Sequence, residues 1–319
     1  MNQNQALLIT SSSAPHPRRH DQAGAFTLIE LLVVIAIIAI LAGLLLPALA
    51  LAKQQSQSAK CMSNTRQIMI CWHMYADDDR DVLAPNDYPW LTPYATQNRN
   101  ARFEFKNWVC GTMEQAVDST NLSELSDGVG TALSECLPNP FVWHCPADTY
   151  VDPQSKGLHV RSYSMNSAVG TMWYTYYATN GSPPFGAPVN GDWLDGSSYQ
   201  ANNYLTYARL SSFTQPGPAN TFVIMDENPI SINDGSLAIS AKAALGETYL
   251  IDFPSGNHNQ SAGIAFADGH STIHKWVDPR TYCPTWSGAP GDITTASTHQ
   301  SPDNMDCLHY LAAITSALR

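Results

Sequence analysis

Hydrophobic and polar residues divide the chain into three parts. Residues 1–25 are mostly polar and have no regular pattern. The next part, 26–52, is almost entirely apolar, with Glu30 as its single charged residue. After residue 78 the chain alternates short apolar segments with clusters of Gly, Pro, Asn and Ser. This pattern predicts a leader at 1–25, a long helix at 26–78 and a β-rich head at 79–319.

The apolar part is long enough to cross a membrane, because about 20 apolar residues span the hydrocarbon core as a helix. Its many β-branched residues would also suit a buried strand, but such strands have only about 4–8 residues. A secretory hydrophobic region of about 7–15 residues is too short as well. We therefore predict a transmembrane helix at about 26–49. Pro47 lies inside it and is expected to kink or locally open the helix.

The second half of the long helix has a different pattern. Residues 51–79 contain neither proline nor glycine. Cys61, Ile68, Trp72 and Tyr75 recur at helical spacing and form one apolar stripe. We expect this amphipathic half to pack against the head, whereas the apolar half needs lipid or other copies of itself around it.

Two segments of the head have the composition of strands, namely TFVIM at 221–225 and GIAFA at 263–267. Clusters of turn-forming residues flank both segments. The head is therefore predicted to be an antiparallel sheet that packs on the amphipathic half of the helix. This is an α+β fold.

The dipeptide Asp268-Gly269 follows the second of these segments and predicts a hairpin with a two-residue turn. In that register Ile264 lies opposite Ile273, on a face that should be buried. His270 and His274 lie four residues apart on the returning strand, a distance of about 13 Å, which is too far for them to bind one metal ion.

The charge of the chain limits its partners. The formal net charge is −11, only 13% of the residues are charged, and Lys and Arg form no cluster in the head. Nucleic acid is therefore not an expected partner. Basic residues lie on both sides of the apolar part, so the positive-inside rule alone does not place the head.

The seven cysteines do not form a C-x-x-C pair, so the usual zinc spacing is missing. If the head lies outside the cytoplasm, Cys136 with Cys145 and Cys283 with Cys307 are the candidates for disulfides because each pair is close in sequence. Buried free thiols are an equally good interpretation, since pairing cannot be read from spacing.

The stretch AFTLIELLVVIAIIAILA resembles the N-terminal signature of type IV pilins and type II secretion pseudopilins. The resemblance implies that a prepilin peptidase cuts between Ala25 and Phe26 and that Phe26 is then N-methylated. Glu30 becomes the fifth residue of the mature chain. The family usually has Gly before the cut, and here Gly24 lies one place earlier, so a cut after Gly24 is the alternative. The signature also includes a proline near the end of the span, here Pro47.

This resemblance implies a pilin-like fold with the head packed on the long helix. It also implies a single-pass protein of the bacterial inner membrane, with the N-terminus cytoplasmic before processing and the head in the periplasm or at the cell surface. Other pilin-like subunits and the peptidase are its implied partners. Glu30 would pair with the new amine at Phe26 during assembly of a filament, where such a pair fixes register.

A second resemblance involves the head. His258, nine further residues and then Asp268-Gly269 match the H-x9-DG signature of a large bacterial family of pilin-like proteins. The segments at 145–166 and 224–236 also resemble the middle of those proteins. The turn accounts for Asp268 and Gly269. We expect His258 to form a hydrogen bond with that turn or with a neighbouring strand, in preference to a ligand role.

A calcium site is an alternative for the head, because type II major pseudopilins bind calcium there. Asp226, Glu227, Asp234 and Asp268 are oxygen donors near predicted turns. The sequence contains no D-x-D-x-D-G loop, and the triplet at 77–79 is the solvated end of a helix. No other cofactor is expected.

Enzyme signatures such as H-E-x-x-H, G-x-S-x-G and the P-loop are missing from the sequence. His144 precedes Cys145, but neighbours on a strand point apart, so a structural role is the better interpretation. The sequence therefore predicts a non-enzymatic, prepilin-like subunit. The alternative is a membrane-anchored module that binds an extracellular polymer such as a glycan and uses the helix only as an anchor; an anchored hydrolase has the least support.

Overall fold

The computed structural model describes most of the long helix and much of the head. It covers residues 27–86, 107–113, 116–126, 130–172, 186–191, 193–195, 203–242, 250–282 and 303–319. The residues predicted to flank the cleavage bond, Gly24, Ala25 and Phe26, lie outside this set, as does Cys283. The chain forms two compact units, Met1–Ala50 and Leu51–Arg319.

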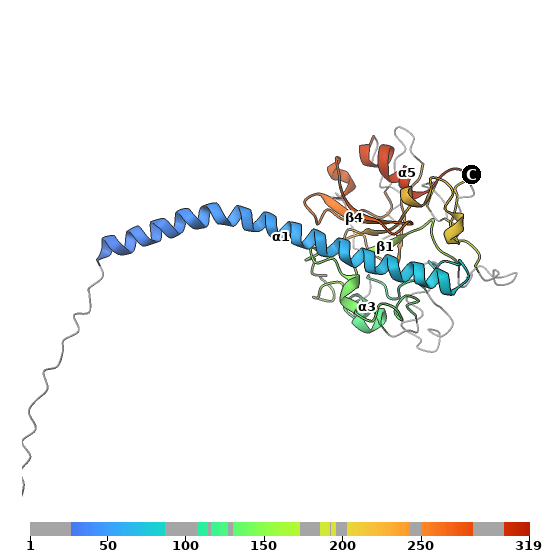
Figure 1. Ribbon diagram of the computed structural model, residues 1–319, viewed down its shortest axis with the longest axis horizontal. Coiled ribbons are helices and arrows are strands. Elements are labelled where there is room, and N and C mark those ends of the chain that lie inside the picture. The colour runs from blue at the N-terminus through green and yellow to red at the C-terminus, as the bar shows by residue number, and fades with distance from the viewer. Residues whose placement is uncertain are drawn as a thin grey trace, which may run out of the picture. The chain divides into compact units, whose positions relative to one another are not determined.

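One long helix, α1 (Leu28–Asp78), confirms the predicted N-terminal helix (Figure 1). Pro47 lies inside α1, and the helix continues beyond it to Asp78. Proline removes one backbone donor, but the neighbouring turns keep their own hydrogen bonds.

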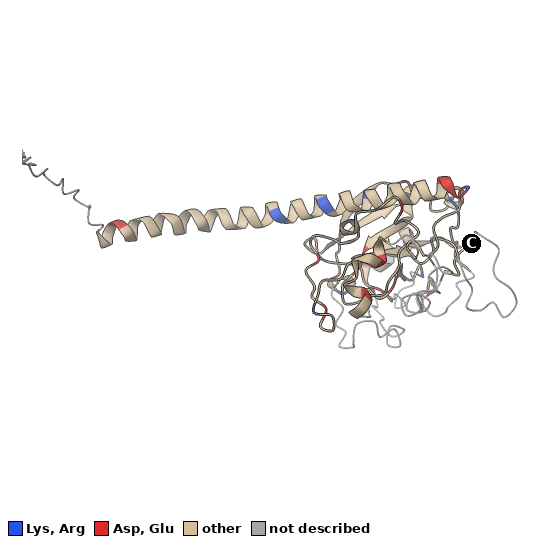
Figure 2. Ribbon diagram, turned by 90° about the horizontal axis from the view of Figure 1, so that it is seen from below, with Lys and Arg blue, Asp and Glu red and all other residues tan. Residues whose placement is uncertain are grey.

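The two halves of α1 have different surroundings. Every Leu, Ile and Val from Leu28 to Leu51 is exposed, and this part is long and apolar enough to cross a membrane. The second half buries the predicted stripe, with Cys61, Ile68 and Trp72 fully buried. Glu30 is the acidic residue in the first turn of α1. Figure 2 shows a long stretch of the helix without charged residues before the first Lys or Arg.

The head is built on a five-stranded, mostly antiparallel sheet, so the predicted α+β fold is confirmed. The strand order is β3-β1-β2-β4-β5. Within this sheet, as far as the described residues form it, β1 and β3 pair in parallel and the other neighbours are antiparallel. The strands are β1 (Tyr163–Asn166), β2 (Phe222–Asp226), β3 (Ser236–Leu237), β4 (Ser261–Phe266) and β5 (Ser271–Lys275). Both predicted strand segments are present, as β2 and β4.

Short helical segments connect and cover the strands. They are α3 (Ala116–Ser119), η3 (Leu122–Leu125), η4 (Pro140–Trp143), η5 (Leu210–Ser212), η6 (Pro218–Asn220), η7 (Pro279–Thr281), the π-helical turn η8 (Cys307–Leu311) and α5 (Ala312–Thr315). The buried apolar residues form two clusters. One contains the residues of α1 with Val223 and Ala265, and the other contains Ile264 with Leu311 and Ile314 of the C-terminal segment. The sheet therefore contributes side chains to two cores.

The hairpin of β4 and β5 differs from its predicted register by one residue. Ile264 lies opposite Thr272, not Ile273, and the Phe266 N–H donates to the His270 carbonyl at 2.9 Å. The loop therefore has three residues, 267–269, and the predicted two-residue turn is wrong. Gly269, the last of them, has a φ of 89°, the left-handed conformation that closes such a loop.

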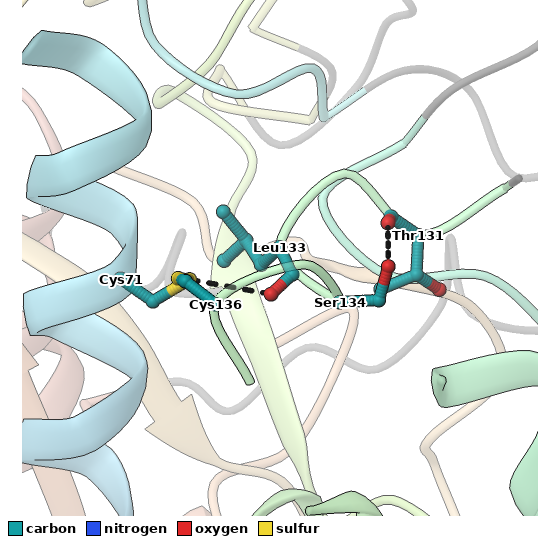
Figure 3. Close-up of a disulfide and its surroundings, with 5 residues drawn as sticks. All are labelled: Cys71, Thr131, Leu133, Ser134 and Cys136. Atoms are coloured by element: carbon teal, nitrogen blue, oxygen red, sulfur yellow. Dashed lines mark hydrogen bonds between the residues drawn. A yellow bond between two sulfur atoms is a disulfide. The ribbon is translucent and has the colours of Figure 1, made fainter. Parts of the chain in front are cut away.

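A disulfide joins α1 to the head. It links Cys71 with Cys136, whose Cα atoms lie 5.7 Å apart and which are 65 residues apart in sequence (Figure 3). The predicted Cys136–Cys145 pairing is therefore wrong, because the fold places Cys136 against the helix. Cys307 has a buried free thiol, so it does not form the other predicted pair. The interpretation as buried free thiols holds for Cys61, Cys145 and Cys307.

Candidate functional site

Four potential metal ligands from distant parts of the chain meet inside the head. They are Cys61 of α1, Cys145 just after η4, Asp226 at the end of β2 and His258 just before β4. Their ligand atoms all lie within 4.8 Å of one another. The exposed fraction is 0% for Cys61, Cys145 and Asp226 and 5% for His258. We call these four residues the buried cluster.

Polar contacts connect the members of the buried cluster. The Nε2 atom of His258 lies 3.2 Å from Asp226 Oδ2 and 3.2 Å from Cys145 Sγ. The thiol of Cys61 donates to Asp226 Oδ2 at 3.2 Å. These contacts place two sulfur atoms, one imidazole nitrogen and one carboxylate around a common point.

Three further groups hold the side chains of the buried cluster in place. The Ser58 hydroxyl lies 3.1 Å from His258 Nδ1. The Gly263 N–H donates to Asp226 Oδ2 at 2.9 Å, and the Tyr163 hydroxyl donates to Cys61 Sγ at 3.5 Å. His258 thus has a partner for its outer ring nitrogen, whereas Asp226 Oδ2 and Cys61 Sγ each accept a further hydrogen bond at the atom that faces the cluster.

The environment changes the acidity of the clustered groups. Burial disfavours the imidazolium of His258, but hydrogen bonds to Asp226 and Cys145 outweigh it and raise the pKa of His258 to about 10. The hydrogen bond from Cys61, together with the one to His258, lowers the pKa of the Cys145 thiol. The pKa of Cys61 is raised well above its usual value by that same hydrogen bond and by burial. Cys145 is therefore the more readily ionised of the two thiols.

The sequence indicated the members of this cluster only one at a time. His258 was expected to bond the turn or a neighbouring strand. It does bond Asp226 of β2, which pairs with β4, but not the turn. The histidine that contacts the Cys145 thiol is His258, not its sequence neighbour His144. Cys61 is predicted only as part of the apolar stripe. No short spacing links these positions, so the sequence carries no signal that they meet.

The two ends of the H-x9-DG segment have separate roles. His258 precedes β4 and Asp268-Gly269 follows it, so the strand of six residues, about 20 Å long, separates them. Asp268 is exposed, and its Oδ1 accepts from the His270 N–H at 3.1 Å. The spacing of the segment is therefore the length of β4 with its two flanking turns.

The four carboxylates of the calcium prediction lie in different surroundings. Asp226 belongs to the buried cluster, and Asp268 lies in the hairpin loop. Glu227 and Asp234 are buried near the guanidinium of Arg161. Burial lowers the pKa of Arg161 to about 10, although the negative charge of Glu227 acts in the opposite direction. Burial raises the pKa of Asp234 to about 6. The described residues do not bring the four carboxylates together, and calcium binding stays a prediction.

A second candidate site is the start of α1. The Thr27 N–H donates to Glu30 Oε2 at 2.9 Å, and the Glu30 N–H donates to the Thr27 hydroxyl at 3.2 Å. The Thr27 hydroxyl also donates to Glu30 Oε2 at 2.7 Å. This reciprocal pattern is a capping box, which satisfies free N–H groups at a helix start. The T-x-x-E spacing is its sequence signal, which the sequence analysis missed.

Comparisons with known proteins bear on this N-terminal region. Residues 22–46 match the family model of the prokaryotic N-terminal methylation motif. The chain has a prepilin-type N-terminus. No curated protein and no solved structure matches the chain.

The prepilin-type segment at 22–46 includes several of the N-terminal features described above. It contains the predicted cleavage bond, Glu30 and most of the exposed apolar half of α1. The match concerns the N-terminal segment alone and does not extend into the head. Together with the apolar helix, it indicates anchoring in a membrane.

Proposed function

We propose that this protein is a prepilin-like or pseudopilin subunit with no reaction of its own. Prepilin peptidase removes residues 1–25 by cutting between Ala25 and Phe26, and Phe26 is N-methylated. The first half of α1 crosses the bacterial inner membrane once. The head lies outside the cytoplasm, in the periplasm or at the cell surface.

The observation that carries this proposal is the prepilin-type segment at 22–46, which leads into a helix whose large apolar side chains are exposed throughout its first half. A helix that is apolar on all sides is unstable in water and needs lipid or protein around it. The Cys71–Cys136 disulfide supports a head outside the cytoplasm, since stable disulfides belong to oxidising compartments.

Assembly into a type IV pilus-like or type II secretion-like filament would give the apolar half its partners, which are other pilin-like subunits. The capping box places the Glu30 carboxylate at the Thr27 N–H, one residue from Phe26. A cut before Phe26 creates a positive amine at this helix end. Glu30 would then pair with that amine, in the same subunit or in a neighbour, and set the register of the helices.

Mass spectrometry of the mature N-terminus tests the proposal. The full chain would be expressed in the membrane with and without a prepilin peptidase. With the peptidase we expect a chain that begins with methylated Phe26, and without it the uncut chain. A chain that keeps Met1 in the presence of an active peptidase would contradict the proposal. A terminus at Ala25 would contradict only the assigned bond.

Electron microscopy of sheared cells and of purified membranes tests assembly. Filaments that contain the processed chain are the expected result. Processed chains that stay as dispersed monomers, in cells with a working filament system, would contradict assembly. They would favour the membrane-anchored binding module, whose ligand a glycan array with the detergent-solubilised chain would identify.

A further inference from the structure

We propose that Cys61, Cys145, Asp226 and His258 bind one Zn²⁺ ion in a closed structural site that fastens α1 to the head. The site is independent of the processing and assembly proposed above.

The positions of the ligand atoms fit a tetrahedral ion. Zinc bonds are about 2.3 Å to sulfur and about 2.0–2.2 Å to nitrogen or oxygen, so ligand atoms of a tetrahedral site lie about 3.3–3.8 Å apart. His258 Nε2 lies 3.2 Å from Asp226 Oδ2 and 3.2 Å from Cys145 Sγ. Cys61 Sγ lies 3.2 Å from Asp226 Oδ2, and no pair exceeds 4.8 Å. Lengthening these three contacts by a few tenths of an ångström, and closing the widest pair by about 1 Å, would admit the ion.

The donor set selects the kind of metal. Two thiolates, one imidazole and one carboxylate suit zinc, whereas calcium takes six to eight oxygen ligands. All four donors come from the protein and are buried, which leaves no open position for a substrate. Such a closed site is typical of structural zinc.

The surroundings of the buried cluster match those of a metal site. A metal-bound histidine usually directs its second ring nitrogen to a polar partner, and Ser58 occupies that place 3.1 Å from His258 Nδ1. A glycine is also needed beside the ligands. A Cβ at Gly263 would lie 3.0 Å from Cys61 Sγ and 3.1 Å from Asp226 Oδ2. The backbone of β4 therefore approaches the cluster closely because it has no side chain there.

A metal at this site would link α1 to the rest of the head at a second point, in addition to the disulfide. Cys61 and Cys71 are ten residues apart on the helix, about 15 Å. The metal would hold α1 at Cys61 and the disulfide holds it at Cys71. Zinc would also connect four parts of the chain, at residues 61, 145, 226 and 258, which makes metal binding and folding of the head interdependent.

The test begins with the unaltered full chain in detergent. After exposure to zinc and removal of the excess, elemental analysis should give one zinc per chain. Replacement by Co²⁺ should give the charge-transfer band of thiolate ligands and the strong visible bands of tetrahedral cobalt. A chelator should lower the melting temperature, and added zinc should restore it. A folded chain that binds no zinc and gives no cobalt bands would overturn the proposal.

Variants assign the ligands. In Cys61→Ser and His258→Ala we expect zinc affinity to fall by at least about tenfold, since even outer groups of zinc sites change affinity by about 10–100-fold. Ser58→Ala should weaken binding by about that amount. Cys307→Ser is the matched control, because Cys307 is a buried free thiol of the other core and should bind normally. Unchanged affinity in both ligand variants would overturn the assignment.

Thiol labelling of the unaltered chain avoids any dependence on whether a variant folds. Peptide mass spectrometry would measure alkylation of Cys61 and Cys145 before and after chelation. We expect protection by zinc and labelling of both after its removal. A Cys61–Cys145 disulfide in the native chain would overturn the proposal, since a disulfide leaves no thiolates for zinc.

Discussion

The two halves of α1 form one uninterrupted helix but depend on different surroundings. From Leu28 to Ala50 the large apolar side chains are exposed, and this half belongs to the first compact unit, Met1–Ala50. From Leu51 to Asp78 one face is buried in the core of the head. Secondary structure is therefore the same in both halves, and the distribution of apolar side chains decides what each half needs around it.

The two halves of α1 should also differ in how sensitive they are to substitutions. The first half needs only length and hydrophobicity to enter a bilayer, so most single changes between apolar residues should be tolerated there. The second half has defined neighbours for each buried side chain and is fastened by a disulfide. Changes of shape should therefore matter in the second half, and changes of charge should matter in the first.

The largest effect is expected from Trp72→Ala. Trp72 is fully buried in the core between α1 and the head. Its loss should lower the free energy of unfolding of the head by about 3–5 kcal/mol. Chemical denaturation followed by fluorescence of the remaining tryptophans would measure it.

Ile70→Ala is the matched control for Trp72→Ala, because Ile70 belongs to the same half and is 61% exposed. It should change the free energy of unfolding by no more than about 0.5 kcal/mol. Equal losses for the two variants would contradict the assignment of a buried and an exposed face to this half.

A somewhat smaller effect is expected when the disulfide is removed. The double variant Cys71→Ser, Cys136→Ser should lose about 2–4 kcal/mol, because the bond closes a loop across 65 residues. The melting temperature under non-reducing conditions measures this loss. Addition of a reductant to the unaltered chain should reproduce it, and a reductant that has no effect would show that the bond does not form.

The charge test concerns the first half. Ile37→Arg places a charge near the middle of the proposed span and should cost about 2.5–3.5 kcal/mol of insertion. Ile70→Arg adds the same charge to an exposed site in the second half and should leave insertion unchanged. Protease protection of the chain in membranes measures both. Full insertion of Ile37→Arg, equal to that of Ile70→Arg, would refute the membrane-spanning role.

The sequence predicted the features that depend on local pattern. The helix, its buried stripe through Ile68 and Trp72, and the strands β2 and β4 all follow from periodicity and composition. The hairpin register was wrong by one residue, because Asp-Gly favours a two-residue turn while the observed loop uses Gly269 as its third residue. Turn length depends on how the sheet twists and packs, which the dipeptide alone does not specify.

The buried cluster and the disulfide could not be predicted for a different reason. Cys71 and Cys136 are 65 residues apart in sequence. In the buried cluster, Cys61 is 165 residues from Asp226 and Cys145 is 113 residues from His258. Contacts of this kind depend on the placement of α1 on the sheet. Proximity in sequence instead suggested Cys136 with Cys145, a pairing that the fold excludes.

The smallest effect on stability, and the sharpest test of the proposed assembly contact, concerns Glu30. Glu30→Gln keeps a capping side chain at this position but removes its charge, whereas Glu30→Leu removes both. Each should change the stability of the helix only slightly and leave insertion intact. If Glu30 pairs with the amine of Phe26, both variants should assemble poorly, as judged by the amount of sheared filament. If its role is only to cap Thr27, Glu30→Gln should assemble normally and Glu30→Leu should not, which would refute the pairing.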